Sequence, residues 1–118
     1  MKACAEILKK FYLNCNIMDE VVLRLNPKNH GAFYIMHDGE QMGEMVISIA
    51  DNVLTAYHTE VEPKAEGKGL AKKLLEGMVA YAREHQLKVL PLCAYVHAQF
   101  KRHPEEYADI WIRQKEEE

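Results

Sequence analysis

The chain contains little cysteine. Its 118 residues include Cys4, Cys15 and Cys93, an odd number without close spacing. A disulfide framework or a structural zinc module needs paired or closely spaced cysteines, so neither is indicated. We therefore expect reduced thiols and no metal site.

Long hydrophobic runs and an excess of positive charge are missing as well. No apolar stretch approaches the roughly 20 residues of a membrane span. Near the N-terminus, charged Glu6, Lys9 and Lys10 interrupt the apolar residues, unlike a signal-peptide core. The formal net charge of -3 gives no general affinity for nucleic acid or for an acidic membrane. These absences predict a cytoplasmic protein without nucleic-acid or membrane partners.

What is present is the composition of an ordinary globular domain, with 48% apolar and 28% charged residues. A chain of this length builds one core and not two. Near the N-terminus, four residues recur at helical spacing, namely Cys4, Leu8, Phe11 and Cys15, which predicts a helix from Met1 to about Cys15. We expect an accessory helical segment over 1–17, one domain over 18–113 and a polar tail over 114–118.

The segments after residue 18 have the alternation of strands. Glu20 to Leu25 alternates between two faces, and three further stretches follow, Ala32–His37, Met42–Ala50 and Val53–Val61. The turn residues Asp38-Gly39 and Asp51-Asn52 separate the last three. Four strands joined by tight turns predict an antiparallel meander.

An amphipathic helix follows the meander. Leu70, Leu74 and Met78 lie on one helical face, and the pattern ends near His85-Gln86. Lys88–Cys93 is a short apolar strand in which Pro91 cannot donate a hydrogen bond, so we expect an edge or a splayed pairing there. Ala94–Arg102 is again helical. A helix between two strands makes them parallel neighbours, which predicts an α+β fold with one mixed sheet.

Lysines crowd the start of the first of these helices. Lys64, Lys68, Lys72 and Lys73 lie at the end where the helix dipole normally favours acidic residues. The arrangement becomes favourable if a strong anion binds the free N–H groups, with glycines allowing its close approach. The segment therefore predicts a phosphate-bearing ligand.

Two common phosphate motifs do not fit this segment. A P-loop needs a hydroxyl residue after its lysine, but Lys68 is followed by Gly69-Leu70. A dinucleotide fingerprint needs three glycines, and only Gly67 and Gly69 are present. Both motifs are excluded.

The spacing of Lys64, Gly67 and Gly69 resembles the pyrophosphate-binding signature of the GNAT acetyltransferases, Gln/Arg-x-x-Gly-x-Gly/Ala. Lys64 departs from the usual Gln or Arg. Further segments complete a resemblance to the short, single-domain YjdJ-type branch of that superfamily: His58-Thr59-Glu60-Val61, Pro91-Leu92-Cys93, Arg102-His103-Pro104-Glu105 and Tyr107-Ala108. It runs from about Met18 to Trp111 and implies a GNAT-like (acyl-CoA N-acyltransferase) fold.

The resemblance implies acetyl-CoA as the ligand, with its pyrophosphate on the N–H groups of Gly67 to Ala71. The pantetheine arm would pass between the strand ending near Val61 and the strand Lys88–Leu92. The implied cofactor-binding residues are Val61, Lys64, Gly67, Lys68, Gly69, Leu70, Ala71, Cys93 and Lys101. The alternative is that the glycines only form a tight turn and the lysines are a solvated face.

The catalytic residues are less evident. Many GNAT enzymes use a tyrosine on the helix after the last core strand to serve the leaving thiol, but here Phe100 falls near that position and Tyr95 is the nearest substitute. The resemblance marks His58 and Cys93 as candidates. His58 would act as a base toward an amine or toward Cys93, and Cys93 would assist proton transfer or form a transient acyl-thioester. The alternative is a buried apolar role for Cys93 and a hydrogen-bonded strand position for His58.

The sequence thus predicts a minimal acetyl-CoA-dependent N-acetyltransferase that uses direct transfer. Larger relatives build acceptor pockets from helices after the first strand, whereas Asn26–Gly31 is only a short connection. The amine acceptor, a small molecule or a protein amine, therefore stays open. The alternative function is a CoA- or acyl-CoA-binding module without useful turnover. We expect a monomer or weak homodimer.

Overall fold

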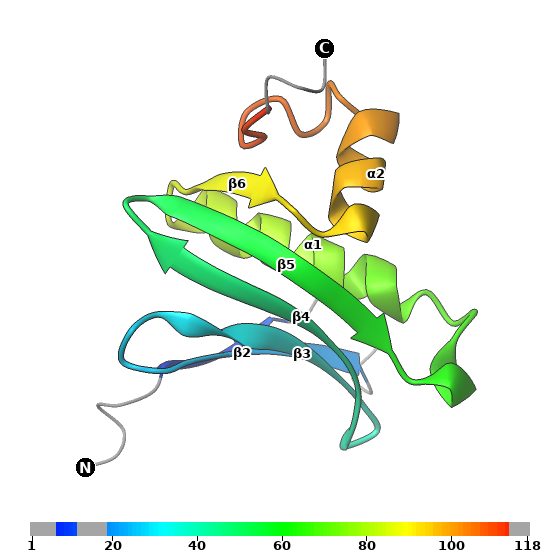
Figure 1. Ribbon diagram of the computed structural model, residues 1–118. Coiled ribbons are helices and arrows are strands. Elements are labelled where there is room, and N and C mark those ends of the chain that lie inside the picture. The colour runs from blue at the N-terminus through cyan, green and yellow to red at the C-terminus, as the bar shows by residue number, and fades with distance from the viewer. Residues whose placement is uncertain (1–6, 12–18, 114–118) are drawn as a thin grey trace.

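The computed structural model describes residues 7–11 and 19–113 (Figure 1). The elements follow in the order β1 Ile7–Phe11, β2 Asp19–Leu25, β3 His30–His37, β4 Glu40–Ala50, β5 Val53–Val61, the short 3-10 helix η2 Pro63–Ala65, α1 Leu70–Glu84, β6 Lys88–Pro91 and α2 Ala94–Arg102. The strands form one six-stranded sheet in sequence order.

The predicted meander is confirmed. Strands β2 to β5 pair antiparallel with their neighbours along the chain. The two tight turns have the positive φ angles that such hairpins need, at Asp38 and Gly39 and at Asp51 and Asn52. The turn residues therefore set the strand boundaries.

The predicted parallel pairing of the two strands on either side of the helix is confirmed too. Helix α1 connects β5 to β6, and these strands pair in parallel from Val53 with Lys88 to Ala56 with Pro91. Figure 1 shows α1 lying along one face of the sheet, with α2 beyond the end of β6. The fold is the predicted α+β arrangement with one mixed sheet.

The helix predicted from Met1 to Cys15 is wrong where the structure describes that segment. Residues 7–11 form strand β1, which pairs antiparallel with β2 from Ile7 with Leu25 to Phe11 with Val21. A short isolated helix is marginal in water, whereas the edge of β2 offers a row of hydrogen-bonding groups. Residues 1–6, 12–18 and 114–118 lie outside the described residues, so the accessory segment, the boundary at residue 18 and the polar tail stay predictions.

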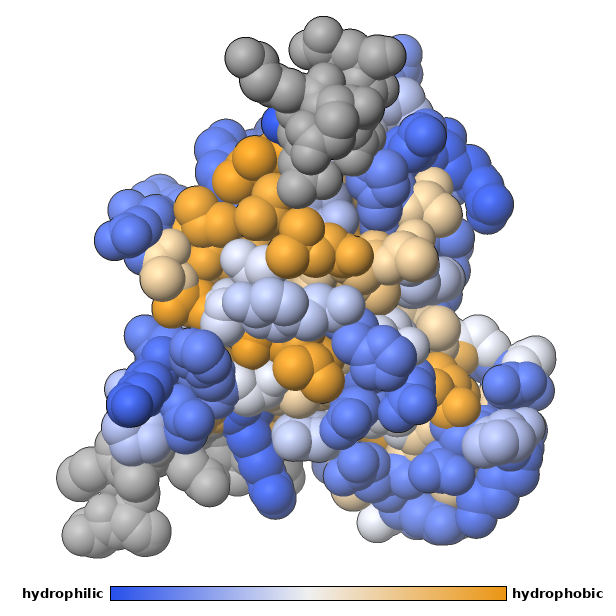
Figure 2. Space-filling view, viewed as in Figure 1, coloured by the Kyte–Doolittle hydropathy of each residue, from blue (hydrophilic) through white to orange (hydrophobic). Residues whose placement is uncertain are grey.

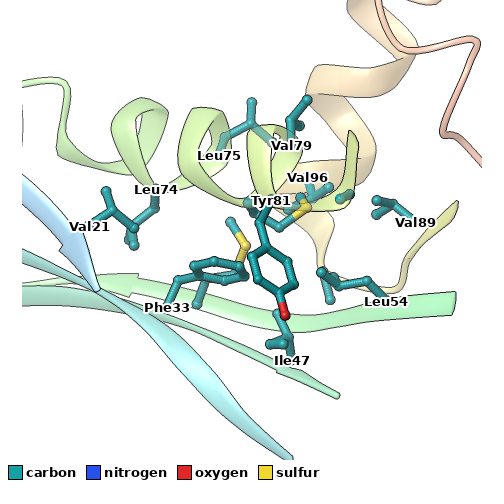
Figure 3. Close-up of a cluster of buried hydrophobic side chains, with 14 of the residues drawn as sticks. Val21, Phe33, Ile47, Leu54, Leu74, Leu75, Val79, Tyr81, Val89 and Val96 are labelled. Atoms are coloured by element: carbon teal, nitrogen blue, oxygen red, sulfur yellow. The ribbon is translucent and has the colours of Figure 1, made fainter. Parts of the chain in front are cut away.

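The core lies between the sheet and α1. In Figure 3, Leu74 and Tyr81 of α1 point toward the strands, where Val21, Phe33, Ile47 and Leu54 lie, whereas Leu75 and Val79 project from the opposite side of the helix. The rings of Phe33 and Tyr81 meet edge to face, with centroids 5.8 Å apart. The apolar stripe predicted from the sequence is thus the buried face of α1.

The other face of the sheet is more open. Figure 2 shows hydrophobic and weakly polar residues at the centre of the face seen in that view, with hydrophilic margins around them. On β5, Tyr57 and His58 are exposed. The connection between β2 and β3, residues 26–29, is too short to add a helix on this side.

The C-terminal segment packs on β6. Residues 104–110 form turns and not a regular helix, and Trp111 makes a parallel bridge with Val89. Trp111 is buried against Phe100, with ring centroids 5.7 Å apart. Among the described residues, no helix has the length and apolar character to cross a membrane.

Helix α1 approaches β2 closely at Gly77. A Cβ built on Gly77 would lie 2.9 Å from Val21 Cγ1 and 3.2 Å from Val21 Cβ. Both distances are too short for ordinary contact, and a valine has no flexible end that can move aside. The glycine is therefore needed for the docking of α1 on the sheet.

We predict that Gly77→Ala destabilises the protein. Alanine normally gains about 1 kcal/mol over glycine inside a helix. Overpacking against Val21 costs about 1–3 kcal/mol and outweighs that gain. Urea denaturation should show a lower midpoint for Gly77→Ala, and adding Val21→Ala should cost less than the sum of the single changes. A more stable Gly77→Ala protein would contradict this packing account.

Candidate functional site

The pairing of β5 with β6 stops halfway along β5. The last paired residues are Ala56 and Pro91, and the Cys93 N–H then donates to the Ala56 carbonyl at 2.8 Å. Strand β5 continues to Val61 without β6 beside it. We call residues 57–61 on this side the open edge of β5, and it confirms the splayed pairing predicted at Pro91.

A β-bulge marks the same point. Val46 pairs with His58 and Ile47 with Ala56, so Tyr57 is an extra residue in β5. The bulge changes which residues face the core: Ala56 is buried before it, and Thr59 and Val61 are half-buried after it.

Backbone groups are available along the open edge. The Glu62 N–H donates to the Met42 carbonyl at 2.7 Å, which fixes the hydrogen-bonded pairs between β4 and β5. Because successive residues direct these groups to alternate sides, Thr59 and Val61 direct theirs away from β4. An extended ligand can therefore bond to β5 as a neighbouring strand would.

The glycine loop, residues 66–69, leads from η2 to α1. Gly67 and Gly69 have φ angles of 86° and 76°, in the left-handed region that favours glycine, and Gly69 caps α1. A Cβ on either glycine would meet nothing within 4 Å. The space in front of the helix is thus open, and its first N–H groups have no partner within the helix.

A smaller cavity of about 210 Å³ lies against this loop. Its walls are residues 65–67 and 69–72 together with Val61 and Tyr95. Five of the predicted cofactor-binding residues are among them, namely Val61, Gly67, Gly69, Leu70 and Ala71. A helix N-terminus with glycines at its mouth suits a phosphate group.

The four lysines near this helix start differ in their partners. Lys64 Nζ donates to Glu40 Oε2 at 3.0 Å, and Lys73 Nζ donates to the buried carboxylate of Asp19. No carboxylate of the described residues pairs with Lys68 or Lys72. The positive charge available to a ligand therefore comes from Lys68 and Lys72.

A larger cavity of about 640 Å³ adjoins the smaller one and shares Val61 and Glu66 with it. It is lined by residues 59–63 with Gln41, Gly43, Glu44 and Glu66. Four of these residues are glutamates, and no lysine or arginine in the described part of the chain lines the cavity. The larger cavity is therefore acidic, and the smaller cavity beside it is lined by the first turn of α1 with its N–H groups.

Cys93 and His58 occupy different surroundings. Cys93 is 4% exposed, and its Sγ lies 3.1 Å from Thr59 Oγ1, which lies on the larger cavity. The His58 side chain is 57% exposed, and its Nε2 lies 3.6 Å from Glu60 Oε2. His58 and Thr59 are successive residues of β5 and point to opposite faces, so the described contacts join Cys93 to Thr59 and His58 to Glu60.

The aromatic residues of α2 divide between core and cavity. Phe100 is fully buried and stacks on Tyr107, with centroids 4.5 Å apart. Tyr95 lies on the smaller cavity, where burial raises the pKa of its phenol above the ordinary value of 10. Lys101 is exposed on the last turn of α2 and lines neither cavity. Lys64 and Lys68 are exposed as well and also line neither cavity.

Sequence reasoning did not assign Thr59 or Glu66 to the site, and it named Lys72 only among the lysines at the start of the helix. Glu66 lies within the glycine motif, Thr59 lies within the segment His58-Thr59-Glu60-Val61 that also carries the resemblance, and Lys72 follows Gly69 by three residues. The sequence shows how near these residues lie to the motif, but it does not show that they line a cavity. That placement depends on the three-dimensional arrangement of β5, β6 and α1.

The family model of the GCN5-related N-acetyltransferases matches residues 32–110, more than half of the chain. No curated protein matches the chain. The match does not test the YjdJ-type branch, which stays a prediction.

Solved structures share the fold. A GCN5-like protein from Staphylococcus aureus has 28% identity and a TM-score of 0.56, with 71% of this chain and 83% of that one covered. The ribosomal-protein-alanine N-acetyltransferase of Brucella melitensis has 19% identity and a TM-score of 0.52, with coverages of 74% and 66%. The ribosomal-protein-S18-alanine N-acetyltransferase of Escherichia coli has 16% identity and a TM-score of 0.50, with coverages of 52% and 41%. This chain thus spans less than half of the E. coli enzyme.

The matched residues contain the open edge of β5, the glycine loop and α1. The fold of the chain is that of the GNAT acyl-CoA N-acyltransferases, as the resemblance predicted. The chain belongs to the GCN5-related N-acetyltransferase family.

Proposed function

We propose that the protein is an acetyl-CoA-dependent N-acetyltransferase that transfers the acetyl group by direct attack of an amine. The observation that carries the proposal is the junction of two features: a helix N-terminus opened by two glycines, and a strand edge left free beside it. One holds an anion and the other holds an extended, amide-bearing chain. Coenzyme A has both parts, and its thioester supplies an activated acetyl group.

The residues of the smaller cavity fit a pyrophosphate. The first-turn N–H groups of α1 donate to its oxygens, and Gly67 and Gly69 keep side chains out of its approach. Lys68 and Lys72 add charge at the end where the helix dipole is positive. Val61 and Tyr95 supply wall on the side toward β5 and α2.

The pantetheine arm fits the open edge of β5. Its amide groups can exchange hydrogen bonds with Thr59 and Val61, which direct their backbone groups away from β4. The arm then leads from the glycine loop toward Cys93, where β5 and β6 meet.

With an amine that is cationic in solution the chemistry needs three proton transfers. The ammonium first loses a proton to free its lone pair, the nitrogen loses a second proton after attack, and the departing sulfur takes one, so that one proton is released overall. His58 is the base that we assign to the nitrogen, and its Nε2 lies 3.6 Å from Glu60 Oε2. Because His58 lies on the face of β5 opposite Thr59, the amine attacks across the open edge of β5. Cys93 and Thr59 are assigned to the sulfur, since their side chains already share a hydrogen bond. Direct transfer requires no bond between the acetyl group and Cys93.

The acceptor reaches this point through the larger cavity. The four glutamates on its wall, Glu44, Glu60, Glu62 and Glu66, raise the local concentration of cations. We therefore propose an amine that is cationic in solution, either a polyamine or the amine of a basic protein segment.

We predict that the purified protein acetylates such an amine when acetyl-CoA is added. Mass spectrometry of spermidine, a lysine-containing peptide and a weakly basic aromatic amine tests this, with product expected for the first two. Replacement of the base in His58→Gln should slow transfer about a hundredfold.

The intact protein should carry no acetyl group during turnover, and Cys93→Ala should keep part of the rate. An acetylated protein that loses the label in Cys93→Ala would replace direct transfer by a thioester route. If the protein binds CoA but acetylates none of these amines, a CoA-binding module without turnover is the better description.

We predict that Gly67→Val weakens CoA binding at least about tenfold, the equivalent of 1.4 kcal/mol. The valine side chain would stand where the phosphates approach the helix, and calorimetric titration measures the loss. The matched control is Gly39→Val in the β3–β4 turn, where φ is +81° and a Cβ also meets nothing within 4 Å. Both changes should cost about 1–2 kcal/mol of stability through the left-handed backbone, but only Gly67→Val should change the affinity. Equal CoA affinity in the two variants would overturn the placement of the pyrophosphate.

A further inference from the structure

A buried carboxylate lies behind the first turn of α1, away from the open mouth of the glycine loop. Asp19, at the start of β2, is 6% exposed. One of its oxygens contacts Lys73 Nζ of α1, and the other contacts His37 Nδ1 at the end of β3. Three elements are joined at this one side chain.

The carboxylate is ionised at neutral pH. Burial raises the pKa of Asp19, but hydrogen bonds from Lys73 and His37 outweigh it and leave the pKa below its ordinary value of 3.8. A lowered pKa means that the contribution to stability is complete above about pH 4 and is lost as the pH falls through the folded-state value. The side chain of Lys73 is 18% exposed, so its pair with Asp19 is largely shielded from water.

Lys73 is also the residue that closes the first turn of the helix. Its N–H donates to the carbonyl of Gly69, the capping residue, at 3.2 Å. Gly77, one turn later on the same helix face, packs against Val21. Since Asp19 and Val21 lie on one face of β2, the helix is held on this strand at two successive points.

The free N–H groups of this turn belong to Leu70, Ala71 and Lys72, which line the smaller cavity. Their direction depends on how the turn is seated on the sheet. We infer that Asp19 is a positioning residue for the ligand's pyrophosphate: through Lys73 it fixes the turn whose N–H groups bind the phosphates. The inference rests on the proposed binding of CoA in this cavity.

A positioning role and a purely electrostatic role of Asp19 predict opposite effects of its removal on the affinity for CoA. Asp19→Asn takes away a negative charge near a bound anion and frees the cation of Lys73, so electrostatic attraction alone would tighten binding. Loss of positioning would weaken it, because the first turn is no longer tied to β2. The sign of the change in CoA affinity therefore separates the two.

The experiment is calorimetric titration of the full chain with CoA, for wild type, Asp19→Asn, Lys73→Met, Lys73→Arg and the double change Asp19→Asn/Lys73→Met. We expect Asp19→Asn and Lys73→Met each to weaken binding about tenfold, within the usual range of coupling between two sites. The double variant should bind no more weakly than either single one, because both break the same link. Lys73→Arg keeps the charge pair and should retain most of the affinity.

The matched control is Asp109→Asn, which breaks the exposed Arg83–Asp109 pair away from both cavities and should leave the affinity within about twofold. Circular dichroism at the titration temperature confirms that each variant is folded. If Asp19→Asn does not fold, Asp19→Glu carries the test, because it keeps the charge and displaces the carboxylate by one methylene. Weaker CoA binding by folded Asp19→Glu is then the expected result, and unchanged binding would overturn the inference.

Unchanged or tighter CoA binding by folded Asp19→Asn, or equal affinity of Lys73→Met and wild type, would overturn the inference. Failure of the wild-type protein to bind CoA would instead overturn the proposed function on which it rests.

Discussion

The short parallel pairing of β5 with β6 is the constraint on which the site depends. It lasts for four residue pairs and ends where Pro91 lacks an N–H and where Tyr57 is inserted as a bulge. Beyond that point the edge of β5 is open and the larger cavity lies along it. Cys93, the N-cap of α2, lies where the two strands separate. Continued pairing would close the edge and leave a phosphate site with nothing beside it.

The second constraint is the seating of α1. Its N-terminal turn is useful to an anion only while the N–H groups face the smaller cavity, and that direction follows from contacts on the other side of the helix. Gly77 allows the helix close to Val21, and Lys73 binds Asp19 below the first turn. The apolar core therefore sets the distance between α1 and the sheet. The buried ion pair between Lys73 and Asp19 holds the N-terminal turn of α1, where the ligand's phosphates would bind.

Much of the fold was predictable because its boundaries are local. Asp38-Gly39 and Asp51-Asn52 set the hairpins by their backbone preferences, and the apolar stripe from Leu70 to Ala82 set the helix. Strand β1 was not predictable in this way. Its four apolar residues have helical spacing, and that spacing carries no information about the free edge of β2 with which the segment pairs.

The same division holds in the site: Gly67 and Gly69 could be identified from spacing. That Lys64 and Lys73 are held by Glu40 and Asp19 could not, since the latter pair lies 54 residues apart in the chain.

The account's central claim is that the glycine loop and the open edge of β5 together hold one molecule of coenzyme A. The most direct measurement is a titration of the ¹⁵N-labelled protein with CoA, followed by the amide resonances in two-dimensional NMR spectra. The account predicts saturable shifts concentrated at residues 66–72 and at Thr59 and Val61. Unmoved resonances at millimolar CoA, or shifts confined to residues away from both cavities, would contradict it.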